Sequence, residues 1–104
     1  MVQEIKDKED FEKVLSEHKV VVVDFTATWC GPCKMVAPKF EEMSKKYPDA
    51  VFVKVDVDQC QDISQNAGIR AMPTFHIYKE KQRVTEIIGV NVTKLEADLQ
   101  TALA

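Results

Sequence analysis

Two cysteines separated by two residues are the residues of this chain best suited to chemistry. Cys30 and Cys33 enclose Gly31 and Pro32, and a helical pattern follows them. The thiolate is the reactive form of cysteine, and N–H groups at a helix N-terminus stabilise an anion placed there. Pro32 has no N–H to donate and fits the first turn of a helix. One helical turn between the two cysteines brings their sulfurs within bonding distance. The spacing predicts a redox pair in which exposed Cys30 attacks a substrate disulfide and less exposed Cys33 releases the product.

The strand predicted before this pair carries an acid. Val20–Val23 and Phe25 predict a buried strand, because the run is β-branched and too short for a helix. Asp24 is its only charge, where a strand buried on both faces normally has none. Burial raises the pKa of a carboxyl, which suits proton exchange near neutral pH. We therefore predict that Asp24 accepts the proton that Cys33 loses; the alternative is a structural acid whose hydrogen bonds are satisfied.

Other cysteine chemistries are alternatives at this point. A C-x-x-C pair can be half of a zinc site, but the sequence has no second C-x-x-C and no H-x-x-x-H, and we expect no metal. A cysteine–histidine hydrolase would pair Cys30 with His76, a histidine without a surrounding motif. Cys60 is isolated and predicts an inert, half-buried thiol at a helix start, with a second redox centre as the alternative.

The composition limits the class of protein. With 104 residues, 45% hydrophobic and 30% charged, the chain is expected to form one soluble domain over residues 1–104. A net charge of −3 and scattered basic residues do not support nucleic-acid binding. The apolar runs are shorter than the ~20 residues of a membrane span, and the first ten residues lack the apolar part of a signal peptide. Three cysteines favour a reducing, cytoplasmic location.

Alternating strand and helix patterns place the cysteine pair inside an α/β fold. The predicted strands are Val2–Ile5, the valine run from Val20, Val51–Val57, Thr74–Tyr78 and Arg83–Ile88. The predicted helices are one capped by Asp7, one from Cys33 to about Tyr47, one over Cys60–Ala67 ending at Gly68, and one that starts at Asn91 or Thr93. This order predicts three mutually parallel strands followed by an antiparallel hairpin, with helices on both faces of the sheet.

The run Trp29-Cys30-Gly31-Pro32-Cys33-Lys34 resembles the active-site motif of the thioredoxin family, most of all its animal-type cytosolic members. The resemblance covers essentially the full chain. It includes the valines before Asp24-Phe25, Asp56-Val57-Asp58, Met72-Pro73-Thr74-Phe75 and Gly89. A lone C-x-x-C is a weak signal, whereas five ordered landmarks at matching spacings are a strong one. The resemblance implies the thioredoxin fold, with a central mixed five-stranded sheet flanked by four helices.

The resemblance also implies roles for residues outside the pair. Pro73 is expected to be a cis proline that faces the cysteines, with the Met72 backbone pairing with an extended client chain. Asp58 is expected to hold the Trp29 indole by a hydrogen bond. Lys54 would lower the pKa of Asp24 if it reaches that carboxyl. The implied docking surface is flat and apolar and comprises Trp29, Gly31, Pro32, Met72, Gly89 and Val90.

The implied activity is the reduction of protein disulfides, with electrons from NADPH delivered by thioredoxin reductase. No resident cofactor is expected, because the sequence has no nucleotide-binding glycine motif. The implied clients are peroxiredoxins, methionine sulfoxide reductases and ribonucleotide reductase, and the implied state is a monomer, with a weak dimer over Trp29 as an alternative. The Gly-Pro dipeptide, without a histidine, favours reductase over oxidase. A redox-gated protein-binding module is the alternative function.

One position departs from the family pattern. Lys81 stands in the predicted hairpin turn, where family members commonly have glycine. A left-handed backbone there strains a residue that carries a side chain. The type of this turn is therefore left open by the sequence.

Overall fold

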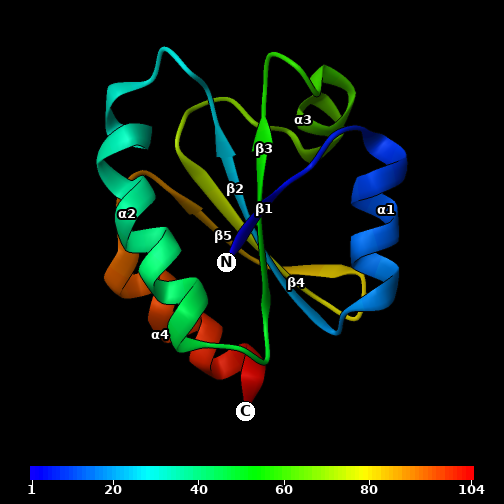
Figure 1. The fold of residues 1–104 in the computed structure, drawn as a ribbon, viewed down its shortest axis with the longest axis vertical. Helices are drawn as coiled ribbons and strands as arrows, with labels where there is room; N and C mark the ends of the chain where they lie inside the picture. The colour runs from blue at the N-terminus through cyan, green and yellow to red at the C-terminus, as the bar shows by residue number, and fades with distance from the viewer.

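The computed structural model describes residues 1–104, in which five strands and four helices alternate (Figure 1). The strands are β1 (Val2–Glu4), β2 (Val20–Thr26), β3 (Val51–Asp56), β4 (Thr74–Lys79) and β5 (Gln82–Ile88). The helices are α1 (Lys8–Glu17), α2 (Gly31–Lys46), α3 (Gln61–Ala67) and α4 (Val92–Leu103). Every predicted element is present. Helix α2 begins two residues before its predicted start, because Cys30 serves as its N-cap.

The strands form one mixed sheet in the order β1-β3-β2-β4-β5. Strands β1 and β2 both run parallel to β3, whereas β4 runs antiparallel to β2 and to β5. This arrangement confirms the predicted parallel crossovers followed by an antiparallel hairpin. The β2 strand, which leads into the cysteine pair, lies at the centre of the sheet, and all its residues except Thr26 are buried.

Helices cover both faces of the sheet, α1 and α3 on one side and α2 and α4 on the other (Figure 1). Alternation along β2 divides its side chains between two cores. Val20 and Val22 join the core beneath α2 and α4, which includes Phe40 and Leu99. Val21, Val23 and Phe25 join the core beneath α1 and α3. None of the four helices combines the length and hydropathy that crossing a membrane requires.

The helix ends follow from local side-chain chemistry. Asp7 caps α1 by accepting the Asp10 N–H at 2.8 Å, as predicted. Gly68 ends α3 with a φ of 73°, a left-handed value that glycine adopts without strain. Asn91 caps α4 by accepting the Lys94 N–H at 3.1 Å, so the alternative start at Thr93 is wrong. Glu96 of α4 accepts hydrogen bonds from Lys46 and Tyr47 and so joins α4 to the end of α2.

The β4–β5 hairpin settles the turn that the sequence left open. Lys79 pairs with Gln82, so Glu80 and Lys81 form a two-residue turn. Their φ values of 53° and 71° are both left-handed, which is typical of the type I′ turns that suit the twist of a hairpin. The turn therefore keeps the conformation favoured by glycine although both residues carry side chains, at a cost of roughly 1–2 kcal/mol per residue.

Candidate active site

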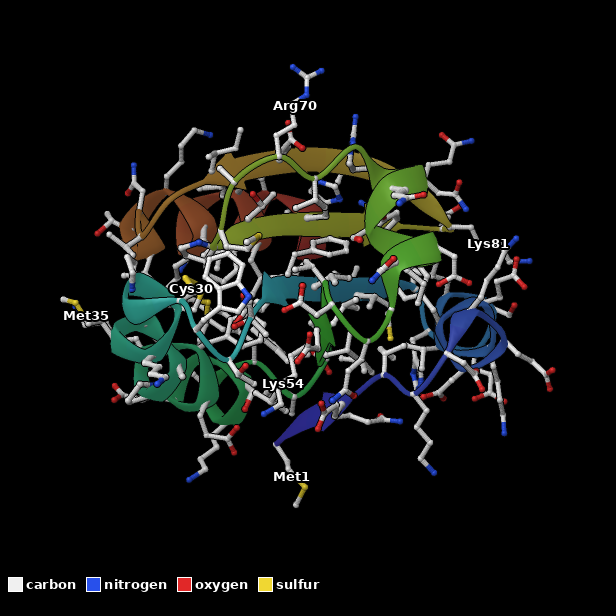
Figure 2. The ribbon with its side chains drawn as sticks, turned by 90° about the horizontal axis from the view of Figure 1, so that it is seen from above. Met1, Cys30, Met35, Lys54, Arg70 and Lys81 are labelled. Carbon is white, nitrogen blue, oxygen red and sulfur yellow. A yellow bond between two sulfur atoms is a disulfide. The ribbon has the colours of Figure 1, made fainter.

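The cysteine pair lies where β2 leads into α2, and its two sulfurs form a disulfide (Figure 2). The Cα atoms of Cys30 and Cys33 are 5.3 Å apart, within the usual range for a disulfide. The Sγ atom of Cys30 accepts the backbone N–H of Cys33 at 3.2 Å and acts as the side-chain cap of α2. The structure thus places Cys30 Sγ against an N–H group that would stabilise a thiolate there.

The predicted exposure of Cys30 is wrong for this disulfide form. Cys30 exposes 5% of its surface and Cys33 2%, so both are buried, although Cys30 is the more exposed of the two, as expected. The reason is local packing: both sulfur-bearing side chains form a small cluster with Ala27, against which Met72 also packs. A client disulfide must therefore reach Cys30 by close contact with the surface around it.

Asp24 is buried behind the pair, in the β2 strand. Only 4% of its surface is exposed, and its Oδ1 atom has no hydrogen-bond partner. Burial raises the pKa of Asp24 to about 7, and the positive charge of Lys54 opposes that rise. The direction agrees with the sequence-based expectation. The unpartnered Oδ1 counts against the alternative of an acid with all its hydrogen bonds satisfied.

A cavity of about 230 Å³ connects Asp24 with Cys33. Both residues line it, together with residues of β1, β2, β3, the loop after β2 and α2: Glu4, Thr26, Ala27, Thr28, Lys34, Ala37, Lys54 and Asp56. Seven of its ten lining residues are polar or charged, and a cavity of this size has room for water. Water in this cavity can relay a proton between the thiol of a reduced Cys33 and the Asp24 carboxyl.

The tryptophan beside the pair is fixed by an acid from the loop after β3. Trp29 exposes 66% of its surface, and its Nε1–H donates to Asp58 Oδ2 at 2.8 Å, which is the bond expected from the family resemblance. Asp56 holds this loop in turn, because its Oδ1 accepts the N–H groups of Asp58 at 2.9 Å and Gln59 at 3.2 Å. No role for Asp56 was predicted from the sequence. Its signal was available, since an aspartate at a strand end often bonds the backbone that follows.

The Met72–Pro73 peptide is cis, and it lies beside the cysteine pair through the contact of Met72 with the sulfur cluster. The carbonyl of Pro73 accepts the Gly89 N–H at 2.8 Å, which brings the end of β5 to the same place. Val90 is half exposed and the α2 residues Gly31 and Pro32 are exposed. The structure thus brings together the residues predicted for client docking, and their binding role stays a prediction.

Two residues considered as alternatives lie elsewhere. His76 is fully buried in β4, packs its ring 4.9 Å from that of Phe25, and contacts Glu86 Oε2 through Nε2 at 2.8 Å. Burial lowers the pKa of His76. Phe25 belongs to the core beneath α1 and α3, so His76 does not face Cys30 and a cysteine–histidine hydrolase is contradicted. Cys60 is a buried free thiol whose pKa burial raises, in agreement with an inert role.

Comparisons with known proteins agree with this geometry. The thioredoxin family model matches residues 2–101. The chain belongs to the thioredoxin family. It is 50% identical to thioredoxin-1 of Schizosaccharomyces pombe, over 99% of this chain and all of that protein, and 48% identical to the thioredoxin of Equus caballus, over 96% and 97%. The fold also matches a chain of a solved structure with a TM-score of 0.91 and 38% identity, over 96% of this chain and 94% of that one. That structure concerns the thiol resolving mechanism in yeast mitochondrial 1-Cys peroxiredoxin via glutathione/thioredoxin systems.

Family membership and the disulfide together establish the activity. Thioredoxins exchange dithiols with disulfides, and Cys30 and Cys33 provide the dithiol in this member. The chain is a protein-disulfide oxidoreductase with the thioredoxin fold. The resemblance to animal thioredoxins inferred from the sequence is confirmed by the identity with the Equus caballus protein.

The buried acid predicts an unusual pH dependence of stability. The pKa of Asp24 is about 7 in the fold against an ordinary value of 3.8, so between these values the folded state holds a proton that the unfolded state lacks. The free energy of unfolding therefore falls as pH rises through this window. Asp24→Asn removes the titration and should make the oxidised protein more stable at pH 8 by about 3 to 4 kcal/mol, with the difference vanishing near pH 4.

Denaturant unfolding of both proteins from pH 4 to pH 8 measures this difference. Asp49→Asn, the same change on an exposed carboxyl, is the control and should leave the pH dependence intact. A difference between Asp24→Asn and the parent that is constant across the pH range would contradict the burial argument.

Proposed function

We propose that this oxidoreductase works as a reductase, using a two-step exchange of thiols. In the first step the Cys30 thiolate attacks one sulfur of a client disulfide, forming a mixed disulfide and releasing the other client sulfur as a thiolate. In the second step Cys33, once deprotonated, attacks Cys30 Sγ. The Cys30–Cys33 disulfide forms and the second client sulfur leaves. The client gains two electrons, and the observed disulfide is the oxidised product of the cycle.

The observation that carries this proposal is the position of Cys30 Sγ at the N-terminus of α2, in bonding contact with Cys33. The N–H groups of that helix end stabilise a Cys30 thiolate and make it reactive at neutral pH. Cys33 lies one turn further and is almost fully buried, so its proton must leave through the protein. We assign that proton to Asp24, which lines the same cavity and has a pKa of about 7.

Client binding is assigned to the apolar surface around the pair. Trp29 and Val90 expose 66% and 50% of their surface, and Met72, two residues before β4, packs against the cysteine cluster. The Met72 backbone, which precedes the cis proline, is free to pair with an extended client segment in the manner of an added strand. Such backbone pairing accepts many sequences, which suits an enzyme that reduces disulfides in different proteins.

The partners proposed for this cycle follow from family membership. Thioredoxin reductase, using NADPH, would return the Cys30–Cys33 disulfide to the dithiol. Peroxiredoxins are proposed as clients, supported by the similarity to a chain studied with a yeast mitochondrial 1-Cys peroxiredoxin. Methionine sulfoxide reductases and ribonucleotide reductase are proposed on family resemblance alone. We place the protein in the cytoplasm, where thiols are kept reduced.

A redox-gated binding module is the competing function, favoured by the exposed Trp29 beside the pair. Cys33→Ser separates the two functions. For the two-step enzyme, this variant should lose turnover in an insulin-reduction assay and accumulate client proteins as mixed disulfides on Cys30, because nothing releases them. The assay rate and non-reducing electrophoresis measure both effects.

Cys60→Ser is the matched control, since Cys60 lies outside the site, and it should turn over normally and trap no client. Normal insulin reduction by Cys33→Ser would rule out the second step as written.

The assignment of Asp24 as base is tested by separating the two steps. Asp24→Asn should slow release from the mixed disulfide at neutral pH by about 10²-fold, the lower end of what a positioned base contributes. The first attack should change little, because Cys30 is stabilised by the helix end and not by Asp24. Stopped-flow measurement of each step, with Asp49→Asn as control, gives both rates. Equal slowing of the two steps would contradict the assignment.

A further inference from the structure

A single row of paired residues crosses all five strands at the level of Asp24. From the β1 edge the row consists of Glu4, Lys54, Asp24, Phe75 and Ile87. Residues paired across adjacent strands point to the same face of a sheet. Phe75 and Ile87 belong to the core beneath α2 and α4, so the whole row faces that layer. The row is charged at the β1 end and apolar at the β5 end, and Asp24 stands at the boundary.

Lys54 has a carboxylate on each side in this row. Glu4 pairs with it from β1 and Asp24 from β2, and all three line the 230 Å³ cavity. Figure 2 shows Lys54 between α2 and β1. The ion pairs of the structure do not include Lys54, so its ammonium is held by neither acid and can approach both. Two strand spacings separate Glu4 from Asp24, about 10 Å.

The other charged groups around Asp24 are committed elsewhere or lie toward solvent. Asp56 of β3 lines the same cavity, but its carboxylate accepts two backbone N–H groups of the next loop. From α2 the cavity receives the exposed Lys34 and the disulfide-bonded Cys33, and from β4 the row contributes only the apolar Phe75. Glu4 makes no side-chain hydrogen bond and no ion pair, which leaves its carboxylate available to Lys54.

We propose that Glu4 is a positioning residue that shares Lys54 with Asp24 and thereby keeps the Asp24 carboxyl protonated to higher pH than Lys54 alone would allow. A nearby cation favours the ionised form of a carboxyl, and a second carboxylate that draws this cation away weakens the effect. The charge of Glu4 also repels a carboxylate at Asp24 directly. Glu4 thus sets, through Lys54, the pH range over which Asp24 changes from acid to base.

The consequence for the reaction rests on the proposed role of Asp24. A carboxyl with a higher pKa is a stronger base but is ionised less at a given pH. Glu4 therefore moves the pH range of the second step upward. The titration of Asp24 itself does not depend on that role, because it can be measured in the disulfide form, in which neither active-site cysteine titrates.

The experiment follows the Asp24 carboxyl of the oxidised protein by carbon-13 NMR as pH is varied. Glu4→Gln should lower the pKa of Asp24 by about 0.6 to 2.4 units. A unit charge about 10 Å away contributes about 0.3 to 1.2 units directly at effective dielectric constants between 80 and 20, and the return of Lys54 to Asp24 contributes about as much again. Glu4→Asp keeps the charge and should keep most of the effect. Glu9→Gln changes the net charge equally on the exposed side of α1 and should leave the pKa of Asp24 unchanged.

The same measurement in a Lys54→Met background tests the sharing. Without the ammonium only the direct repulsion remains, so Glu4→Gln should lower the pKa of Asp24 by about half as much as before, or less. The proposal is overturned if Glu4→Gln shifts this pKa no more than Glu9→Gln does, or if the shift is equal with and without Lys54. Either result would leave the two-step exchange standing, and a failed exchange would leave this titration unaffected.

Discussion

The backbone N–H of Cys33 donates to the sulfur of Cys30 at 3.2 Å, and this hydrogen bond fixes the reactive sulfur at the start of α2. It makes a cysteine the N-cap of a sixteen-residue helix, in the position that serine or aspartate normally holds. The central β2 strand delivers Cys30 to that position, and the helix delivers Cys33 one turn later. A sheet with helices on both faces fixes strand and helix relative to each other, so the fold serves to hold one sulfur against one helix end.

The second feature of the site is the charge state of the Asp24 carboxyl, which lies where the sheet changes from charged to apolar side chains. Asp24 lies in a row with charged residues toward the β1 edge and apolar residues toward β5. Its pKa of about 7 is the balance between burial and the attraction of Lys54. In a fully apolar neighbourhood the pKa of Asp24 would lie too far above neutral pH for the carboxyl to accept a proton. In a full ion pair with Lys54 the pKa would lie too far below neutral pH. The stability lost by burying this acid is the cost of having a base that works near neutral pH.

The sequence predicted the order, pairing and layers of the fold because its signals are local. Valine runs mark the strands, Asp7 and Gly68 mark helix ends, and the alternation of strand and helix leaves few topologies. The cysteine pair and the acid before it were predicted for the same reason.

The burial of Cys30 was not predicted, because it depends on Met72, a residue distant in sequence that packs against the disulfide. The row through Glu4 was also missed, since register between β1 and β3 cannot be read from either strand alone. The left-handed Lys81 shows the converse case, in which hairpin geometry overrides a local preference.

If the start of α2 stabilises a thiolate at Cys30, the pKa of that thiol must be low. In the reduced protein, the rate of Cys30 alkylation measured against pH, with mass-spectrometric mapping of the modified residue, gives this pKa. We expect a midpoint about 1 unit or more below the ordinary cysteine value of about 8.5. A midpoint at about 8.5, equal to that of an unperturbed cysteine, would contradict this expectation.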